Sequence, residues 1–253
     1  MRTALQQLGP IGGPSGAAAL AERLGLWDDP GRGERPRVVA AMIGSADGRA
    51  TVDGRAGGLG SPADRSVLRE LRTAADALLV GSTTLIAENY ATVLDPPQQD
   101  ARAARGLPRT PVMATVSRGM DPRLFEIPLL SEEGQRVLIC TESPADPPSL
   151  RAAVQVARMA PGTLTAGACL RRLREDGVRV VVSEGGPTLL RELLAGGLVD
   201  DLVLTIAPAL VAGSGRSVVH GPVFDPPLGL ELREVLRGED HLFLHYVPAV
   251  SPS

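Results

Sequence analysis

The 253-residue sequence contains no lysine, and only 2% of its residues are aromatic. All 26 basic residues are therefore arginine, so a phosphate group would have to be bound by guanidinium or backbone N–H groups. The scarcity of aromatic rings argues against a base-stacking surface for single-stranded nucleic acid. A net charge of -3 gives no electrostatic reason to expect nucleic acid or an anionic membrane as a partner.

Cysteine and histidine are also scarce. Cys140 and Cys169 stand alone, with no C-x-x-C motif and no histidine pair nearby, which argues against a disulfide framework or a zinc site. We expect both to be buried thiols. His241 and His245 would share one face of a strand but lack a third ligand, so the sequence predicts no metal site.

The beginning of the chain has neither a signal-peptide pattern nor an apolar run long enough to span a bilayer. We therefore predict a cytoplasmic protein without a membrane segment. Residues 1–36 are rich in glycine, proline and alanine and are predicted to form an irregular N-terminal extension. The amphipathic residues 18–27 are expected to fold over the core of the main domain, residues 37–253.

Strand and helix patterns alternate through most of the main domain, which indicates an α/β fold with a mostly parallel, twisted central sheet and flanking helices. Buried-strand patterns occupy residues 37–44, 76–82, 111–117, 135–141 and 178–183, and helical patterns occupy residues 61–75, 165–177 and 186–197. Residues 198–210, 230–238 and 241–248 resemble strands without a long helix between them, which predicts an antiparallel C-terminal edge. An exposed sheet edge favours a homodimer.

The segment SEGGPTLL, residues 183–190, lies between a buried strand and a helix. A glycine pair lets the backbone approach a ligand closely, and the N–H groups and dipole at a helix start favour phosphate. Gly185 and Gly186 are therefore candidates for a pyrophosphate site, although the same pair can serve only as a tight turn.

Two further strand ends carry groups suited to the same ligand, because open α/β sheets bind ligands at the carboxyl ends of their strands. Gly81, Thr83 and Thr84 offer backbone N–H and hydroxyl groups at one of them. Ser117 and Arg118 follow another strand, where a guanidinium could hold the 2′-phosphate that distinguishes NADPH from NADH. Arg118 could also be an ordinary exposed loop charge.

Four segments, IGSADGRATVDG, VGSTTLIAEN, VSEGGPTLL and LVDDLVLTIAPALVAG, resemble the reductase domain of the bifunctional deaminase-reductase of riboflavin biosynthesis. The resemblance implies a dihydrofolate reductase-like fold. It also implies NADPH-dependent reduction of the ribosyl group of 5-amino-6-(5-phosphoribosylamino)uracil. By this resemblance, the cofactor phosphates contact Gly81, Thr84, Gly185, Gly186, Pro187 and Thr188, the adenosine 2′-phosphate lies near Ser117 and Arg118, and the substrate faces Asp47, Glu88 and Glu184.

The sequence departs from this family in three places. The zinc motif of the partner deaminase is missing, which predicts a stand-alone reductase. Ala41 stands about where many members carry a lysine, and Glu88 stands where aspartate is common. These changes leave the exact substrate open while the cofactor motifs remain.

Reduction of a ring-opened imine or aldehyde also needs a proton, which Glu184 or Glu88 could donate or relay. Asp64 has two interpretations. It follows Ser61 by three residues, as in a capping box, or it contacts the pyrimidine or pterin ring from the first helix. The second interpretation makes dihydrofolate or pterin reduction an alternative function. A non-catalytic NADPH-binding relative is the other alternative.

Overall fold

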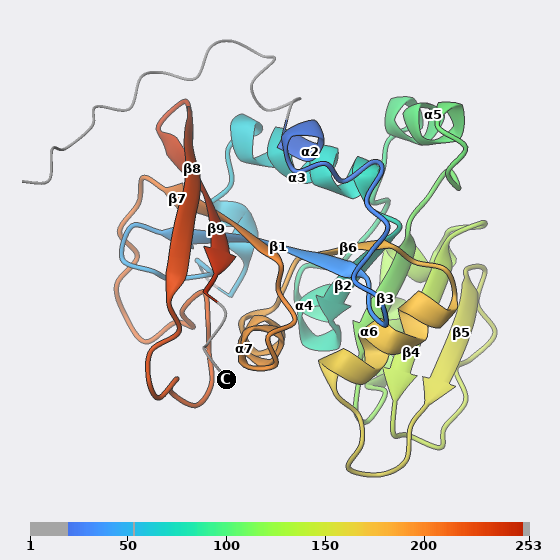
Figure 1. The fold of residues 1–253 in the computed structure, drawn as a ribbon. Helices are drawn as coiled ribbons and strands as arrows, with labels where there is room; N and C mark the ends of the chain where they lie inside the picture. Colours follow the sequence, from blue (N-terminus) through green and yellow to red (C-terminus); the bar gives the residue numbers. More distant parts are fainter. Residues whose placement is uncertain (1–19, 53, 250–253) are drawn as a thin grey trace, which may run out of the picture.

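The computed structural model describes residues 20–52 and 54–249, which form a nine-stranded sheet covered by helices on both faces (Figure 1). The strands run in the order β5-β4-β3-β2-β6-β1-β7-β9-β8. Their bounds are β1 Arg37–Ser45, β2 Ala77–Gly81, β3 Val112–Val116, β4 Arg136–Thr141, β5 Ala153–Arg158, β6 Val180–Ser183, β7 Asp201–Ala207, β8 Leu230–Gly238 and β9 His241–Pro248.

The predicted mostly parallel sheet with an antiparallel edge is confirmed. In the spatial order of the sheet, the neighbouring strands from β5 through β4, β3, β2, β6 and β1 to β7 all run parallel. Strand β9 pairs antiparallel with β7, and β8 pairs antiparallel with β9. One detail differs from the prediction, since β7 pairs parallel with β1 on one side and antiparallel with β9 on the other. The antiparallel edge therefore begins only at the β7–β9 pair. Two-sided burial of β7, which its apolar sequence permits, explains why it joins the parallel part.

The helices divide between the two faces because alternate strand residues point to opposite sides. Their bounds are α2 Leu20–Arg23, α3 Pro62–Ala74, α4 Ser82–Ala87, α5 Pro96–Ala104, α6 Ala166–Glu175 and α7 Pro187–Ala195. Leucines and alanines of α2 and α3 pack with one set of strand residues, and those of α6 and α7 pack with the other. Aliphatic side chains dominate both core clusters, as the low aromatic content predicts.

Part of the predicted N-terminal extension packs against the domain. Leu20, Leu24 and Leu26 are buried in the same core cluster as α3. The Arg37 side chain donates to the Leu24 carbonyl at 2.7 Å and forms ion pairs with Asp29 and Asp201. The prediction that residues 18–27 fold over the core is confirmed for the described residues, from Leu20 onward. The domain boundary between residues 36 and 37 stays a prediction.

Three elements were not predicted from the sequence. Strand β5 is a half-exposed edge strand that follows a proline-rich segment. Helix α4 has only six residues, which is too short for a clear helical pattern in the sequence. Helix α5 begins with a capping box formed by Asp95 and Gln98, and this D-x-x-Q signal was present in the sequence.

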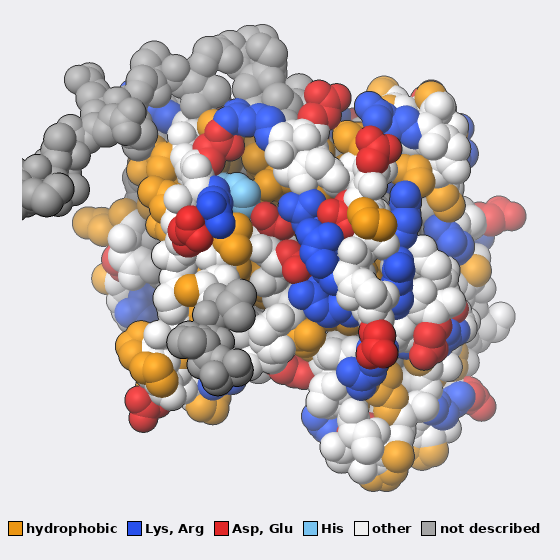
Figure 2. All heavy atoms as spheres, in the orientation of Figure 1, with side chains coloured by type: hydrophobic (Ala, Val, Ile, Leu, Met, Phe, Trp, Pro, Cys, Tyr) orange, Lys and Arg blue, Asp and Glu red, His pale blue; other side chains and the backbone are white. Residues whose placement is uncertain are grey.

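Strand β8 forms the outer edge of the antiparallel part, with Leu230 and Leu232 exposed. The predicted homodimer stays a prediction. In residues 20–52 and 54–249, no helix has the length and apolar character needed to cross a membrane. Figure 2 shows arginine and acidic side chains interspersed over the viewed face. Exposed ion pairs such as Arg109 with Asp100, at 2.6 Å, occur on the surface of the described residues.

Candidate active site

Strand β6 lies between β1 and β2 at the centre of the nine-stranded sheet, and its carboxyl end opens onto a cavity of about 560 Å³. This position agrees with the general placement of ligands in open α/β sheets. The cavity is lined by residues of β1, α3, α4, β7 and the start of α7, among others. Of the residues predicted from the sequence, it is lined by Asp64, Thr83, Thr84, Glu88, Glu184, Gly186 and Pro187.

The glycine pair after β6 is both a tight turn and part of the cavity wall. Gly185 has a φ of +78°, and a Cβ atom there would lie 2.6 Å from the Met42 sulfur. A Cβ atom at Gly186 would overlap the Thr84 hydroxyl. The Gly81 N–H donates to the Gly185 carbonyl at 2.7 Å, which joins the two predicted phosphate loops. The positive φ of Gly185 favours glycine, whereas at Gly186 the obstacle to a side chain is the Thr84 hydroxyl.

Helix α7 starts directly at this turn, with Gly186 as its N-cap and Pro187 at its first position. Its unpaired backbone N–H groups and the positive end of its dipole therefore lie beside the cavity. Thr188, in the first turn, is exposed and does not line the cavity. This arrangement is suited to a phosphate group at the start of α7.

Glu184 is fixed by two neighbours that the sequence interpretation missed. Arg72 donates to both carboxylate oxygens at 2.6 and 2.7 Å, and the Tyr90 hydroxyl donates to Oε2 at 2.6 Å. The Glu184 side chain is only 5% exposed. Three donated hydrogen bonds, two of them from a guanidinium, fix the orientation of this carboxylate. The geometry therefore favours an orienting or binding role for Glu184 over proton donation.

Asp64 faces the cavity from α3. Its backbone N–H donates to the Ser61 hydroxyl at 3.1 Å, so the N-cap predicted at Ser61 is present. The reciprocal hydrogen bond of a capping box, from the Ser61 N–H to the Asp64 carboxylate, is not found among the described residues. Val67, Leu68 and Leu71 line the same cavity at helical spacing from Asp64.

The environment of Asp64 favours its protonated form. Burial raises the pKa of the Asp64 carboxyl, while a hydrogen bond with Thr205 and the charge of His241 oppose the rise. Thr205 lies in β7 and His241 begins β9, the neighbouring strand. His241 is buried, and its Nε2 lies 3.0 Å from the Leu59 carbonyl. Asp64 is the acid in this cavity that is best suited to carry a proton.

Glu88 ends α4 and lines the cavity. Its Oε1 accepts a hydrogen bond of 2.8 Å from the Ala56 N–H. This contact attaches the glycine-rich loop of residues 44–58, which follows β1, to the side of the cavity. Asp53 of that loop lies outside the described residues.

Asp47 was predicted to face the substrate, but it does not line the cavity. Its carboxylate accepts hydrogen bonds from the Ser45 hydroxyl and from the N–H groups of Val211 and Ala212. These bonds, the Ser45 bond above all, lower the pKa of Asp47 to about 2. In this structure Asp47 connects the loop after β1 with the segment after β7.

Ser117 and Arg118 follow the carboxyl end of β3, on the same edge of the sheet as the cavity but outside its lining. Ser117 is buried, and its N–H donates to the Cys140 carbonyl at 3.0 Å. The Arg118 guanidinium is 66% exposed and pairs with Glu142 at 2.6 Å. Their predicted contact with an adenosine 2′-phosphate stays a prediction.

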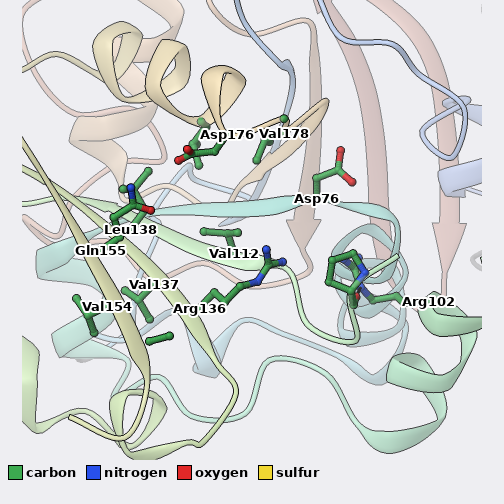
Figure 3. Close-up of a pocket in the computed structure, with 14 residues that line it drawn as sticks. Asp76, Arg102, Val112, Arg136, Val137, Leu138, Val154, Gln155, Asp176 and Val178 are labelled. Atoms are coloured by element: carbon green, nitrogen blue, oxygen red, sulfur yellow. Dashed lines mark hydrogen bonds between the residues drawn. The ribbon is translucent and has the colours of Figure 1, made fainter. Parts of the chain in front are cut away.

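A second cavity, of about 530 Å³, lies at the opposite edge of the parallel sheet and contains none of the predicted site residues (Figure 3). Arg102 and Arg136 are among the residues that line it. Arg102 is fully buried and donates to the carbonyl oxygens of Thr73, Ala75 and Pro108. Burial lowers the pKa of Arg102 to about 10. These contacts give Arg102 a structural role.

Residues 36–243 match the RibD C-terminal domain family. The 2,5-diamino-6-ribosylamino-4(3H)-pyrimidinone 5′-phosphate reductase of Methanothermobacter thermautotrophicus is 30% identical over 81% of this chain and 95% of its own length. The riboflavin biosynthesis protein RibD of Mycobacterium tuberculosis is also 30% identical, over 76% of this chain but only 48% of its own.

Among solved structures, a pyrimidine reductase-like protein from Corynebacterium diphtheriae has a TM-score of 0.74 and 26% identity. The match covers 85% of this chain and 93% of that protein. The family match extends over most of the chain and includes the strand ends, glycine turn and acids that form the cavity. The chain therefore belongs to the RibD C-terminal domain family.

Proposed function

We propose that the protein is an NADPH-dependent reductase of a phosphorylated pyrimidine ribosylamine in riboflavin biosynthesis, of the 5-amino-6-(5-phosphoribosylamino)uracil type. The observation that carries this proposal is the cavity at the centre of the sheet, where the glycine turn and helix start of α7 meet Asp64, Glu88 and Glu184. The archaeal relatives named as pyrimidinone phosphate reductases support it, since this chain covers 95% of one of them.

The glycine turn supports the choice of cofactor. Side chains at Gly185 and Gly186 would collide with Met42 and Thr84, so the turn is kept narrow beside the start of α7. Thr83, Thr84 and the α7 N–H groups would hold the cofactor phosphates. Ser117 and Arg118 are proposed for the adenosine end, where Arg118 would exchange Glu142 for a 2′-phosphate. When bound, NADPH supplies the hydride that reduces the sugar carbon.

We assign the substrate side to the acids and their neighbours. Asp64, whose pKa is raised by burial, would give a proton to the nitrogen or oxygen of the ring-opened imine or aldehyde. Glu184, oriented by Arg72 and Tyr90, would bind substrate polar groups. Glu88 would hold the glycine loop against the bound substrate and exclude water.

The test is oxidation of NADPH, and of NADH in parallel, by the purified protein. The substrates are the phosphoribosylamino-uracil, its 2-amino-pyrimidinone counterpart and dihydrofolate, each offered separately. We expect turnover of one or both pyrimidines with NADPH. Turnover of dihydrofolate alone would assign a pterin reductase. Cofactor binding without turnover of any substrate would support a non-catalytic relative or an altered substrate.

We also propose that the protein is a homodimer that uses its antiparallel edge. The support is the exposure of Leu230 and Leu232 on β8, the outermost strand of that edge. Light scattering that gives the mass of a single 26.3 kDa chain would contradict this assignment.

A further inference from the structure

The only two cysteines of the chain are brought together by the fold. Cys140 lies in β4 and Cys169 in α6, 29 positions later, and their sulfur atoms are 2.7 Å apart. Both side chains are fully buried in the core cluster between the sheet and helices α6 and α7. The predicted burial of both thiols is confirmed, but their proximity was not foreseen from the sequence.

The surrounding structure keeps the two elements in this position. Strand β4 is paired on both sides, with β3 and with β5. The N–H of Leu164, just before α6, donates to Glu142 Oε1 at 2.9 Å, two residues after Cys140. The Ala166 N–H at the start of α6 donates to Glu192 of α7 at 2.6 Å. The thiols are therefore neighbours because strand and helix are fixed independently of them.

We propose that Cys140 and Cys169 are an oxidation site, where peroxide converts the two thiols into an intramolecular disulfide that fastens β4 to α6. A disulfide bond length is about 2.05 Å, so the sulfur atoms need to approach by only about 0.7 Å. The crosslink therefore stabilises the fold without displacing the strand end that carries Glu142.

The reaction is balanced with hydrogen peroxide as the oxidant. One thiolate attacks a peroxide oxygen, the O–O bond breaks, and a sulfenic acid and hydroxide form. The second thiolate attacks the sulfenic sulfur, the S–O bond breaks, and hydroxide leaves as the S–S bond forms. The thiol protons end on the two hydroxide ions, so two thiols and one peroxide give one disulfide and two waters.

The reaction is expected to be slow in the folded protein. A hydrogen bond with Cys140, together with burial, raises the pKa of the Cys169 thiol well above its usual range. Because the thiolate is the reactive form, few molecules react at any moment. The experiment therefore includes an arm in which access to the thiols is not limiting.

In the first arm, folded protein is incubated with hydrogen peroxide. In the second arm, reduced and unfolded protein is refolded in a mixture of reduced and oxidised glutathione. For each protein disulfide that forms, one molecule of oxidised glutathione is reduced to two molecules of glutathione thiol. Each sample is then unfolded, alkylated and weighed by mass spectrometry. We expect the refolded chain to be about 2 Da lighter than the dithiol form and to carry no alkyl group. A Cys140→Ser variant controls for other oxidation.

Crosslinking of positions 29 residues apart should raise the melting temperature, by on the order of 5–10 °C. Reductant should remove this rise, and Cys140→Ser should show none. Alkylation of both cysteines after refolding would overturn the proposal. Disulfide-linked pairs of chains, or sulfinic and sulfonic acids in place of the disulfide, would also overturn it. Mass and melting need no substrate, so these results are independent of the proposed reductase activity.

Discussion

Two cavities in the described part of the chain are similar in volume, about 560 and 530 Å³, but lie at opposite ends of the parallel strands and differ in chemistry. At the carboxyl ends, helices α4 and α7 begin and present N–H groups. At the amino ends, α3 ends, and the carbonyl oxygens of Thr73 and Ala75 accept hydrogen bonds from outside the helix. Arg102 supplies them.

The comparison shows how strand direction assigns roles to the charged residues. A cavity beside helix starts suits an anionic ligand, whereas one beside helix ends suits a guanidinium that belongs to the protein. Acids at the carboxyl-end cavity therefore lie beside the proposed ligand, while Arg102 at the amino-end cavity completes the hydrogen bonding of the fold. The following variants test this division.

The largest effect is expected from Asp64→Asn, which keeps the shape of the side chain but removes its proton. We expect kcat to fall by roughly 10² to 10⁴, the usual contribution of general acid catalysis. In the wild-type protein, kcat should fall as the pH rises through the raised pKa of Asp64, because the deprotonated form cannot donate. The variant should lack this pH-dependent limb, as measured by NADPH oxidation across pH.

Glu184→Gln is the matched control for Asp64→Asn. It weakens the contacts with Arg72 and Tyr90 and should lower turnover, but the pH-dependent limb should remain. If Asp64→Asn reduced only the melting temperature, with kcat and its pH profile unchanged, Asp64 would be a structural helix residue.

A smaller effect is expected from Gly186→Ala. The backbone φ of Gly186 is -57°, which suits alanine, so the only obstacle is the Thr84 hydroxyl. Overpacking of this kind costs about 1–3 kcal/mol, and the KM for NADPH should rise roughly 10- to 100-fold. Adding Thr84→Ala removes the collision and should recover part of the affinity lost in Gly186→Ala. An unchanged KM in the single variant would mean that the cofactor does not use this turn.

At the other cavity, Arg102→Met should change stability and not catalysis. Three carbonyl oxygens would lose a buried donor, and the free energy of unfolding should fall by about 3 kcal/mol. Urea unfolding measures this, and KM for both substrates should stay as in the wild type. Arg109→Gln, which removes an exposed ion pair with Asp100, is the control and should cost little. A rise in KM without destabilisation would show that the amino-end cavity serves a ligand.

The smallest effect is expected from Asp47→Asn. The folded-state pKa of Asp47 is lowered to about 2, so its stabilising contribution is present above its ordinary pKa and is lost as the pH falls toward 2. The variant should unfold at slightly lower urea concentration than the wild type at pH 7, and the difference should shrink at pH 3. A large loss of turnover with unchanged stability would instead place Asp47 at the substrate.

Much of the architecture could be predicted because local sequence patterns indicate the strands, helices and turns. The apolar runs that became β1, β2, β3, β4 and β6 follow period and burial rules, and the Ser61 cap and glycine turn have residue-level signals. The parallel order placed Thr84, Glu88 and Glu184 at one sheet edge, as predicted. Short or half-exposed elements such as α4 and β5 lack such patterns, so they were missed.

The sequence by itself determined the α/β class, the aliphatic core and the set of residues at the strand ends. Only the tertiary structure decided which side chains meet. Arg72 and Tyr90 reach Glu184 across 112 and 94 positions, Cys140 meets Cys169, and Arg102 reaches the end of α3. Local residue preferences act only between neighbours in the sequence. The contacts named above depend on how distant elements pack against one another, and sequence spacing does not reveal which of these side chains come close together.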